Sequence, residues 1–426
     1  MNPIAAIVAG LLALLAIKVA LTPVRAKASA AMSKDEFAAL ALEAIRATGD
    51  TREHVYDAAE FCLRIRDIDS TFYLNNLFQE MQGKPREKCH DFLKRYWEEM
   101  RSREKVESSF DEARAILLPV LRPTTYDHSI KVAVGIDKPF PPQVRVPITT
   151  CHRLGLALDY KMSLAEVRLE QLQKWNVTLE EALEAARANL KKLTSAPFAQ
   201  VSPGVFRSPF NDCYDAARLW LTDVVRALPV KGQPVAFAPE RNHLYVTGSE
   251  DAEGLHAAAK LAQAALQSPR WISGLAVLLT DDGWREFLPP PEHPAFGILK
   301  ELQVETRVRE YTELKTYLEA DHKRTGRDVF VAKAAGWKNP KTGGAHTIST
   351  WTRDVPTFLP RTDSVALVDT SLPKERAVRA IVPWDALQAI AAQRMTPQGL
   401  TPDYHFVETF PTEEELAAIQ AAAPRT

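Results

Sequence analysis

The sequence predicts an α+β fold, built from several small modules of mainly antiparallel sheet with packed helices and preceded by one N-terminal transmembrane helix. Three observations predict it. Residues 1–30 are almost wholly apolar until their basic end. Helix-start signals recur along the rest of the chain and alternate with short runs that have the period of a strand. The connections between these runs are short, which favours antiparallel pairing with helices on one face.

The apolar segment 4–22 is the reason to expect a membrane anchor. At about 1.5 Å rise per residue, a helix of this length approaches the roughly 30 Å hydrocarbon thickness of a bilayer. Lys18 near its end can extend toward headgroups, and Arg25 and Lys27 follow it. Because positive flanks tend to stay in the cytoplasm, we expect a single-pass protein of the cell membrane, with the bulk of the chain cytoplasmic.

Two alternatives to a retained span stay open. Ala28, Ser29 and Ala30 resemble a signal-peptidase site, so the alternative is an exported protein cleaved near Ala30. Against it, no positive charge precedes the apolar run, as a secretory signal would require. The second alternative is a helix buried in the soluble fold, which the Thr22-Pro23 step disfavours.

Composition limits the function classes. The 426 residues suggest two or three domains, and 46% hydrophobic with 25% charged residues is ordinary for a globular chain. The formal net charge of −1 gives no electrostatic reason to bind nucleic acid, so no such partner is expected. The oligomeric state cannot be derived from the sequence.

The four cysteines carry no metal or redox motif. Cys62, Cys89, Cys151 and Cys213 lie far apart, without a C-x-x-C pair or histidines at metal-ligand spacing. We therefore expect no metal, no cofactor and reduced structural thiols, with disulfide pairing as the alternative if the domain were outside the cell.

The first module, residues 31–124, opens with Ser33 and Glu36, which form a capping box for a helix over 34–48. Alternating residues then predict short strands within 61–66 and 71–74, before a charged helix over 85–104.

The second module, residues 125–300, repeats this pattern. Ser163-x-x-Glu166 and Thr178-x-x-Glu181 are two further capping boxes. Asp281-Asp-Gly283 predicts a hairpin turn. The expected elements are a strand over 154–160, helices over 163–175, 178–193, 209–226 and 252–267, and strands over 233–238 and 243–248.

The third module, residues 301–426, is also expected to contain helices alternating with short strands. A capping box at Thr412-x-x-Glu415 predicts the terminal helix. The other expected elements are helices over 311–324 and 384–394 and strands over 328–332, 347–352 and 364–369.

Several segments of the first two modules carry a family resemblance. They are Tyr73-Leu-Asn-Asn-Leu-Phe78, Ile116-Leu-Leu-Pro119, the helical run Leu179–Leu190, Leu228–Pro239 with Arg241, and Ile272-Ser273 before the hairpin. Together, over about residues 34–290, they resemble the YtpQ-like family of bacterial proteins, a domain of unknown function. The resemblance implies an α+β fold and no reaction. Asn242 stands where the resemblance would place an acidic residue.

Seven residues are candidate contacts for a ligand or partner. The polar pair Asn75 and Asn76 interrupts an apolar stretch, with capping of the following helix as the alternative. Aromatic residues concentrate in the C-terminal third, including Trp384, and such residues anchor protein interfaces. The full set is Asn75, Asn76, Arg241, Asn242, Trp337, His346 and Trp351.

The run from Trp337 to His346 contains Gly343-Gly344 and two lysines, as phosphate-binding loops do. It lacks the order G-x-x-x-x-G-K-[ST] and opens no helix, so we predict a long hairpin loop instead.

These observations favour a non-enzymatic protein- or peptide-binding module, anchored in the membrane and facing the cytoplasm. One alternative is a thiol-dependent hydrolase, suggested by the neighbours Cys89-His90 and Cys151-His152. Adjacent side chains usually point in different directions, so adjacency identifies no catalytic residue. The other alternative is an exported cell-envelope ligand-binding protein.

Overall fold

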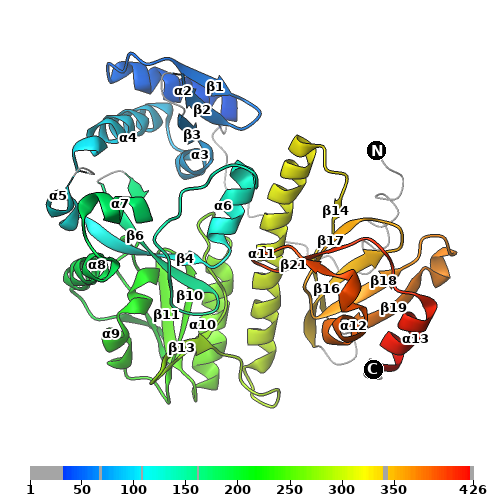
Figure 1. Ribbon diagram of the computed structural model, residues 1–426. Helices are drawn as coiled ribbons and strands as arrows, with labels where there is room; N and C mark the ends of the chain where they lie inside the picture. Colours follow the sequence, from blue (N-terminus) through cyan, green and yellow to red (C-terminus); the bar gives the residue numbers. More distant parts are fainter. Residues whose placement is uncertain (1–31, 67–69, 107–108, 161–162, 339–343, 423–426) are drawn as a thin grey trace. The chain divides into compact units, whose positions relative to one another are not determined.

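The computed structural model describes residues 32–66, 70–106, 109–160, 163–338 and 344–422, and Figure 1 labels many of its helices and strands. The chain divides into two compact units. Unit 1 takes residues up to 113 together with 159–165, and unit 2 takes 114–158 and 166–426.

Unit 1 is a three-stranded antiparallel sheet packed with helices. The strand order is β1-β2-β3, and Cys62 of β2 lies opposite Asp57 and Tyr73. The capping box at Ser33 is confirmed, because the Glu36 amide donates to Ser33 Oγ at 3.2 Å and the Ser33 amide to Glu36 Oε2 at 2.7 Å. The elements are α2 (Lys34–Ala47), β1 (His54–Asp57), β2 (Cys62–Ile65), β3 (Ser70–Tyr73), α3 (Asn75–Met81), α4 (Arg86–Val106) and α5 (Phe110–Arg114).

Unit 2 begins with a small antiparallel sheet in which β4 pairs β6 and β6 pairs β5. The capping box at Thr178 is confirmed, and α8 packs against β4. The elements are β4 (Leu117–Pro123), α6 (Tyr126–Val134), β5 (Val146–Pro147), β6 (His152–Asp159), α7 (Leu169–Trp175) and α8 (Leu179–Leu193). The short strand β7 (Leu164–Glu166) begins in the segment 159–165, which belongs to unit 1.

The helix predicted over 163–175 is wrong in its first half. Residues 164–166 are extended, and α7 begins only at Leu169. The reason is the partner that Glu166 finds: its carboxylate lies 2.7 Å from Arg122 and 2.5 Å from Arg145. A carboxylate held by two largely buried cations cannot turn back to cap a helix start.

A six-stranded antiparallel sheet follows, in the order β13-β12-β10-β11-β9-β8. The predicted hairpin at Asp281–Gly283 is confirmed, since Thr280 pairs with Gly283, whose φ of 109° suits glycine. Helix α10 covers β10 and β11. The elements are β8 (Ala199–Ser202), β9 (Val205–Arg207), β10 (Pro234–Glu240), β11 (His243–Gly248), α10 (Ala252–Ala265), β12 (Val277–Thr280) and β13 (Gly283–Glu286).

The helix predicted over 209–226 is also wrong. Its first half is a loop, followed by the short helices η1 (Ala216–Trp220) and α9 (Thr222–Arg226). Arg218 is fully buried and reaches Asp212 at 2.7 Å. The Asp215 carboxylate accepts the Ser208 hydroxyl at 2.5 Å and the Phe210 amide at 3.1 Å, so side-chain bonds replace helical ones in this loop.

The helix α11 (Phe296–Thr325) is 30 residues long and joins two cores of unit 2. Leu299 and Leu302 belong to the core under the six-stranded sheet, while Leu314 and Leu318 belong to a second core with Phe358. The sequence predicted only its second half, and the module boundary drawn at 300 falls inside it.

The C-terminal part of unit 2 contains two four-stranded sheets, in the orders β14-β17-β21-β20 and β15-β16-β18-β19 (Figure 1). Each includes one parallel pair, β14 with β17 and β16 with β18. The long hairpin loop predicted over 337–346 is shorter than expected, because Trp337 and His346 pair across the strands β15 and β16, and the capped terminal helix is confirmed. The elements are β14 (Phe330–Val331), β15 (Ala335–Lys338), β16 (Ala345–Thr352), β17 (Thr357–Pro360), β18 (Ser364–Val368), η2 (Lys374–Arg376), β19 (Val378–Pro383), α12 (Trp384–Ala391), η3 (Ala392–Arg394), β20 (Thr396–Pro397), β21 (Tyr404–Val407) and α13 (Glu413–Ala422).

The expected fold class needs one correction. The part of the chain that the structure describes is α+β, but no helix in it is long and apolar enough to cross a bilayer. Even the longest, α11, carries charged side chains along its length, from Lys300 and Glu301 to Lys323 and Arg324. The transmembrane helix expected at residues 4–22 lies outside the described residues.

The buried ion pair of Arg218 provides a test of this fold. Replacing Arg218 with Met would leave Asp212 and Asp215 without their cation, and breaking a buried pair typically costs about 3–5 kcal/mol. We expect Arg218→Met to lower the free energy of unfolding by that amount in urea titrations. The control is Arg226→Met, where the side chain is 43% exposed and a loss below about 1 kcal/mol is expected. Equal losses would show that burial of the pair is not decisive.

Candidate functional site

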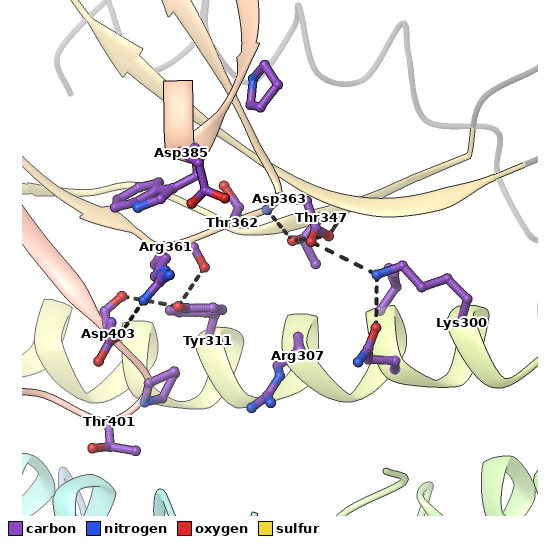
Figure 2. A pocket seen from close by; sticks show the side chains of 15 residues that line it. Lys300, Arg307, Tyr311, Thr347, Arg361, Thr362, Asp363, Asp385, Thr401 and Asp403 are labelled. Carbon is purple, nitrogen blue, oxygen red and sulfur yellow. Dashed lines mark hydrogen bonds and ion pairs between the residues drawn. The ribbon is translucent and has the colours of Figure 1, made fainter. Parts of the chain in front are cut away.

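A cleft of about 500 Å³ in unit 2 is the candidate functional site. One wall is a face of α11, and the other walls come from the sheets and loops of the C-terminal part (Figure 2). The lining residues are Lys300, Gln303, Val304, Arg307 and Tyr311 of α11, together with Thr347, Arg361, Thr362, Asp363, Pro383, Trp384, Asp385, Thr401, Pro402 and Asp403.

The α11 wall is a row of side chains spaced three or four residues apart, which places them on one helix face. Lys300 Nζ donates to Gln303 Oε1 at 2.9 Å and lies 4.0 Å from Asp363 Oδ1. At the other end, the Tyr311 hydroxyl lies 2.8 Å from the Arg361 carbonyl oxygen. Burial raises the pKa of Tyr311, so its hydroxyl keeps the proton that it donates. Both ends of the wall are thereby tied to the facing loops.

Arg307, in the middle of this wall, is held by two carboxylates. Its guanidinium lies 3.0 Å from Glu310 and 3.7 Å from Glu286 of β13. Glu286 also accepts the Gln303 side-chain amide at 2.9 Å. Burial by itself lowers the pKa of Arg307, but Glu310 and Glu286 raise it overall, so the side chain stays charged. Its charge is therefore balanced by carboxylates of the protein, and one of its N–H groups donates to Glu310.

The opposite wall is fixed by a reciprocal pair between β16 and the loop that precedes β18. Asp363 Oδ2 accepts from the Thr347 amide at 2.7 Å and from its hydroxyl at 2.9 Å, while the Asp363 amide donates to Thr347 Oγ1 at 2.9 Å. Arg361 and Asp403 form a longer ion pair at 3.6 Å. The cleft is thus built from polar groups whose positions are set before any ligand arrives.

Asp385 is the exception among the charged lining residues. It is the second residue of α12, is exposed, and makes no ion pair or hydrogen bond that is resolved within the described part of the chain. Figure 2 shows it on the side of the cleft that faces α11, without an interaction with the other lining residues. Its neighbour Trp384 is buried, and the indole NH donates to Gln388 Oε1 at 3.1 Å.

Two of the seven predicted residues lie beside the cleft. Trp337 and His346 are cross-strand partners, and their rings are in contact at a tilted angle of 54°, with centroids 4.6 Å apart. The pKa of His346 is lowered, mainly by burial. The negative charge of Asp363 opposes this shift and the positive charge of Lys300 adds to it, so the imidazole interacts electrostatically with two lining residues. Trp351 is instead fully buried in the core against Phe410.

The structure does not bring the other four predicted residues to the cleft. Asn75 and Asn76 are exposed first residues of α3 in unit 1, and no side-chain hydrogen bond caps that helix, contrary to the expected capping role. Arg241 and Asn242 form the turn between β10 and β11. Asn242 Oδ1 accepts the amide of Cys213 at 2.9 Å, which is a structural role.

The structure shows the surroundings of the two cysteines that have a histidine as the next residue. Cys151 Sγ lies 3.2 Å from His152 Nδ1, so these adjacent side chains do meet. Both are buried: burial raises the pKa of Cys151 to about 11 and lowers the pKa of His152 to about 3. Cys89 is buried too, and burial raises its pKa. Neither thiol is exposed or activated as a nucleophile would be.

None of the seven predicted residues lines the cleft, although Trp384, noted among the C-terminal aromatic residues, does. The row Lys300, Gln303, Arg307 and Tyr311 was missed. The spacing of three or four residues could have identified these four side chains as one helix face. No pattern in the sequence shows that this face lies opposite residues 361–403.

Comparison of the chain with protein-family models, curated proteins and solved structures gives no match. The YtpQ-like resemblance therefore stays a prediction.

Native alkylation should separate the cysteines by exposure. Cys62, Cys89 and Cys151 are 0, 1 and 2% exposed, and Cys213 is partly exposed. We expect iodoacetamide at mildly alkaline pH to modify Cys213 first, as read by peptide mass spectrometry, and to reach the other three only after denaturation. Labelling of Cys151 at the rate of Cys213 would contradict the buried environment.

The buried His152 should make the protein sensitive to acid. With a folded pKa of about 3, His152 stays neutral while the unfolded chain binds a proton below its ordinary pKa near 6.5. Its contribution to stability is thus complete above about pH 6.5 and is lost as the pH falls toward 3. We expect His152→Asn to flatten the fall of the urea midpoint between about pH 7 and pH 5. The exposed His256→Asn is the control, and an identical slope in both variants would refute the assignment.

Proposed function

We propose that the cleft binds a peptide or protein segment and that the protein acts as a non-enzymatic recognition module. The observation that carries this proposal is the cleft of about 500 Å³, whose polar walls are fixed by their own partners. Preorganised groups of this kind lower the ordering cost of binding.

The chemistry of the lining residues supports binding. They supply cations, carboxylates and hydroxyls, together with apolar surface from Val304, Pro383, Trp384 and Pro402. Cys, His and Ser, which are the usual nucleophiles and bases of acyl transfer, do not occur among these described lining residues. Cys151 and His152 are buried and do not line the cleft.

The size of the cleft is that of a ligand site, and its walls suit a polar ligand. Its volume falls within the range of about 300–1,000 Å³ typical of small-molecule and cofactor sites, while its walls carry more polar side chains than such sites usually do. A chain segment offers the alternating donors, acceptors and apolar stems that such walls require.

Blocking the cleft tests this proposal. Thr401 lines it and is only partly buried, so Thr401→Trp would add bulk there. We expect pools of random short peptides captured by the immobilised full-length protein to fall by about tenfold with this variant, quantified by mass spectrometry.

The matched control is Thr370→Trp, which adds the same side chain at an exposed turn position outside the lining. Capture should stay at the wild-type level there. Equal capture by wild type and Thr401→Trp, or no capture above an unrelated immobilised protein, would rule out the cleft as a peptide site.

A further inference from the structure

The charges around the cleft are unevenly matched. Lys300 faces Asp363, Arg361 faces Asp403, and Arg307 faces both Glu310 and Glu286. Each of the three lining cations therefore already has a carboxylate neighbour. Burial raises the pKa of Glu310, yet even without its charge the carboxylates outnumber the cations, because Asp385 adds one more.

Asp385 is the carboxylate that is left over. An acidic residue in the first turn of α12 stabilises that helix through its dipole, which accounts for an Asp at this place in the helix. The helix dipole does not explain why the Asp385 carboxylate lines a cleft in which none of the described cations pairs with it.

An anionic ligand is disfavoured at the same point. The amide of Trp384, first in α12, already donates to the Asp363 carbonyl oxygen at 3.0 Å. Asp385 itself would repel an incoming anion at this helix start. Positive charge is therefore the complement of this end of the cleft.

Apolar surface lines the same cleft as Asp385. Pro383 and Trp384 precede it in the chain, and Pro402 also lines the cleft, so an aliphatic stem would find apolar contacts there. Lys and Arg side chains combine such a stem with a charged head that seeks a carboxylate. A compact inorganic cation would use only the carboxylate and leave this surface without a role.

We infer that the cleft selects a segment with a lysine or arginine side chain, whose charge pairs with Asp385 and whose stem lies along Pro383, Trp384 and Pro402. This inference rests on the proposed peptide-binding function and names its specificity. Asp385 is accordingly the specificity-determining residue of the cleft.

The test compares two pools of short peptides that are random except at the central position. That position is arginine in one pool and citrulline, its neutral isostere, in the other. We expect the full-length protein to capture the arginine pool about tenfold better, and Asp385→Asn to reduce this preference to near unity. Asp354→Asn, which removes an exposed carboxylate from a left-handed turn position that Asn also adopts, should keep the wild-type preference.

The outcomes separate the two proposals. Equal capture of both pools by wild type, with loss of both in Thr401→Trp, would overturn the selection of a cation but leave the peptide site standing. An arginine preference that survives in Asp385→Asn would overturn the role of Asp385. Capture of neither pool would overturn both proposals. The circular dichroism spectrum and melting midpoint of Asp385→Asn, each expected to match wild type closely, keep the result separate from misfolding.

Discussion

The packing of α11 is the constraint on which the rest of unit 2 depends. One stretch of the helix, with Leu299 and Leu302, completes the core under the six-stranded sheet, and a later stretch, with Leu314 and Leu318, completes the core around Phe358. Each buried leucine contributes about 1.5–3 kcal/mol, so the helix cannot leave either core without a large loss. Since the same helix supplies one wall of the cleft, the position of that wall is fixed by hydrophobic packing on both sides of it.

Polar interactions then decide which groups of the cleft remain available. Glu286 of β13 holds Gln303 and approaches Arg307, while Thr347 holds Asp363. The charged side chains of the walls are therefore paired with one another or with neighbouring residues. Asp385, in the first turn of α12, has no such partner among the described residues. A cleft of fixed shape with one uncompensated carboxylate is the arrangement that recognition of a cationic side chain requires, since little has to reorganise on binding.

The contact between Cys151 and His152 shows why proximity is insufficient for catalysis. The two groups lie within hydrogen-bonding distance, as a nucleophile and its base would. Burial, however, favours the neutral form of both, so the thiol keeps its proton and the imidazole does not gain one. Both side chains are buried in unit 2 and neither lines the cleft, which is consistent with a structural role.

The sequence by itself determined the features that depend on residues close together in the chain. The capping boxes at Ser33, Thr178 and Thr412 and the Asp281–Gly283 turn are present because their partners lie within three residues. The α+β character follows from the same local patterns, and the formal net charge of −1 follows from composition. Of the C-terminal aromatic residues that the sequence singled out as a possible interface, Trp384 lines the cleft and Trp351 is buried in the core, and their role in binding stays a prediction.

Tertiary structure decided the rest, wherever a distant partner competes with a local one. Glu166 forms ion pairs with Arg122 and Arg145 and does not cap the predicted helix. The predicted helix over 209–226 begins with a loop, because buried Arg218 pairs with Asp212 in that loop. The start of α11 escaped prediction because a helix buried in two cores shows no single apolar stripe. The cleft joins residues as far apart in the chain as Lys300 and Asp403, and only the packing of α11 against the C-terminal sheets brings such residues together.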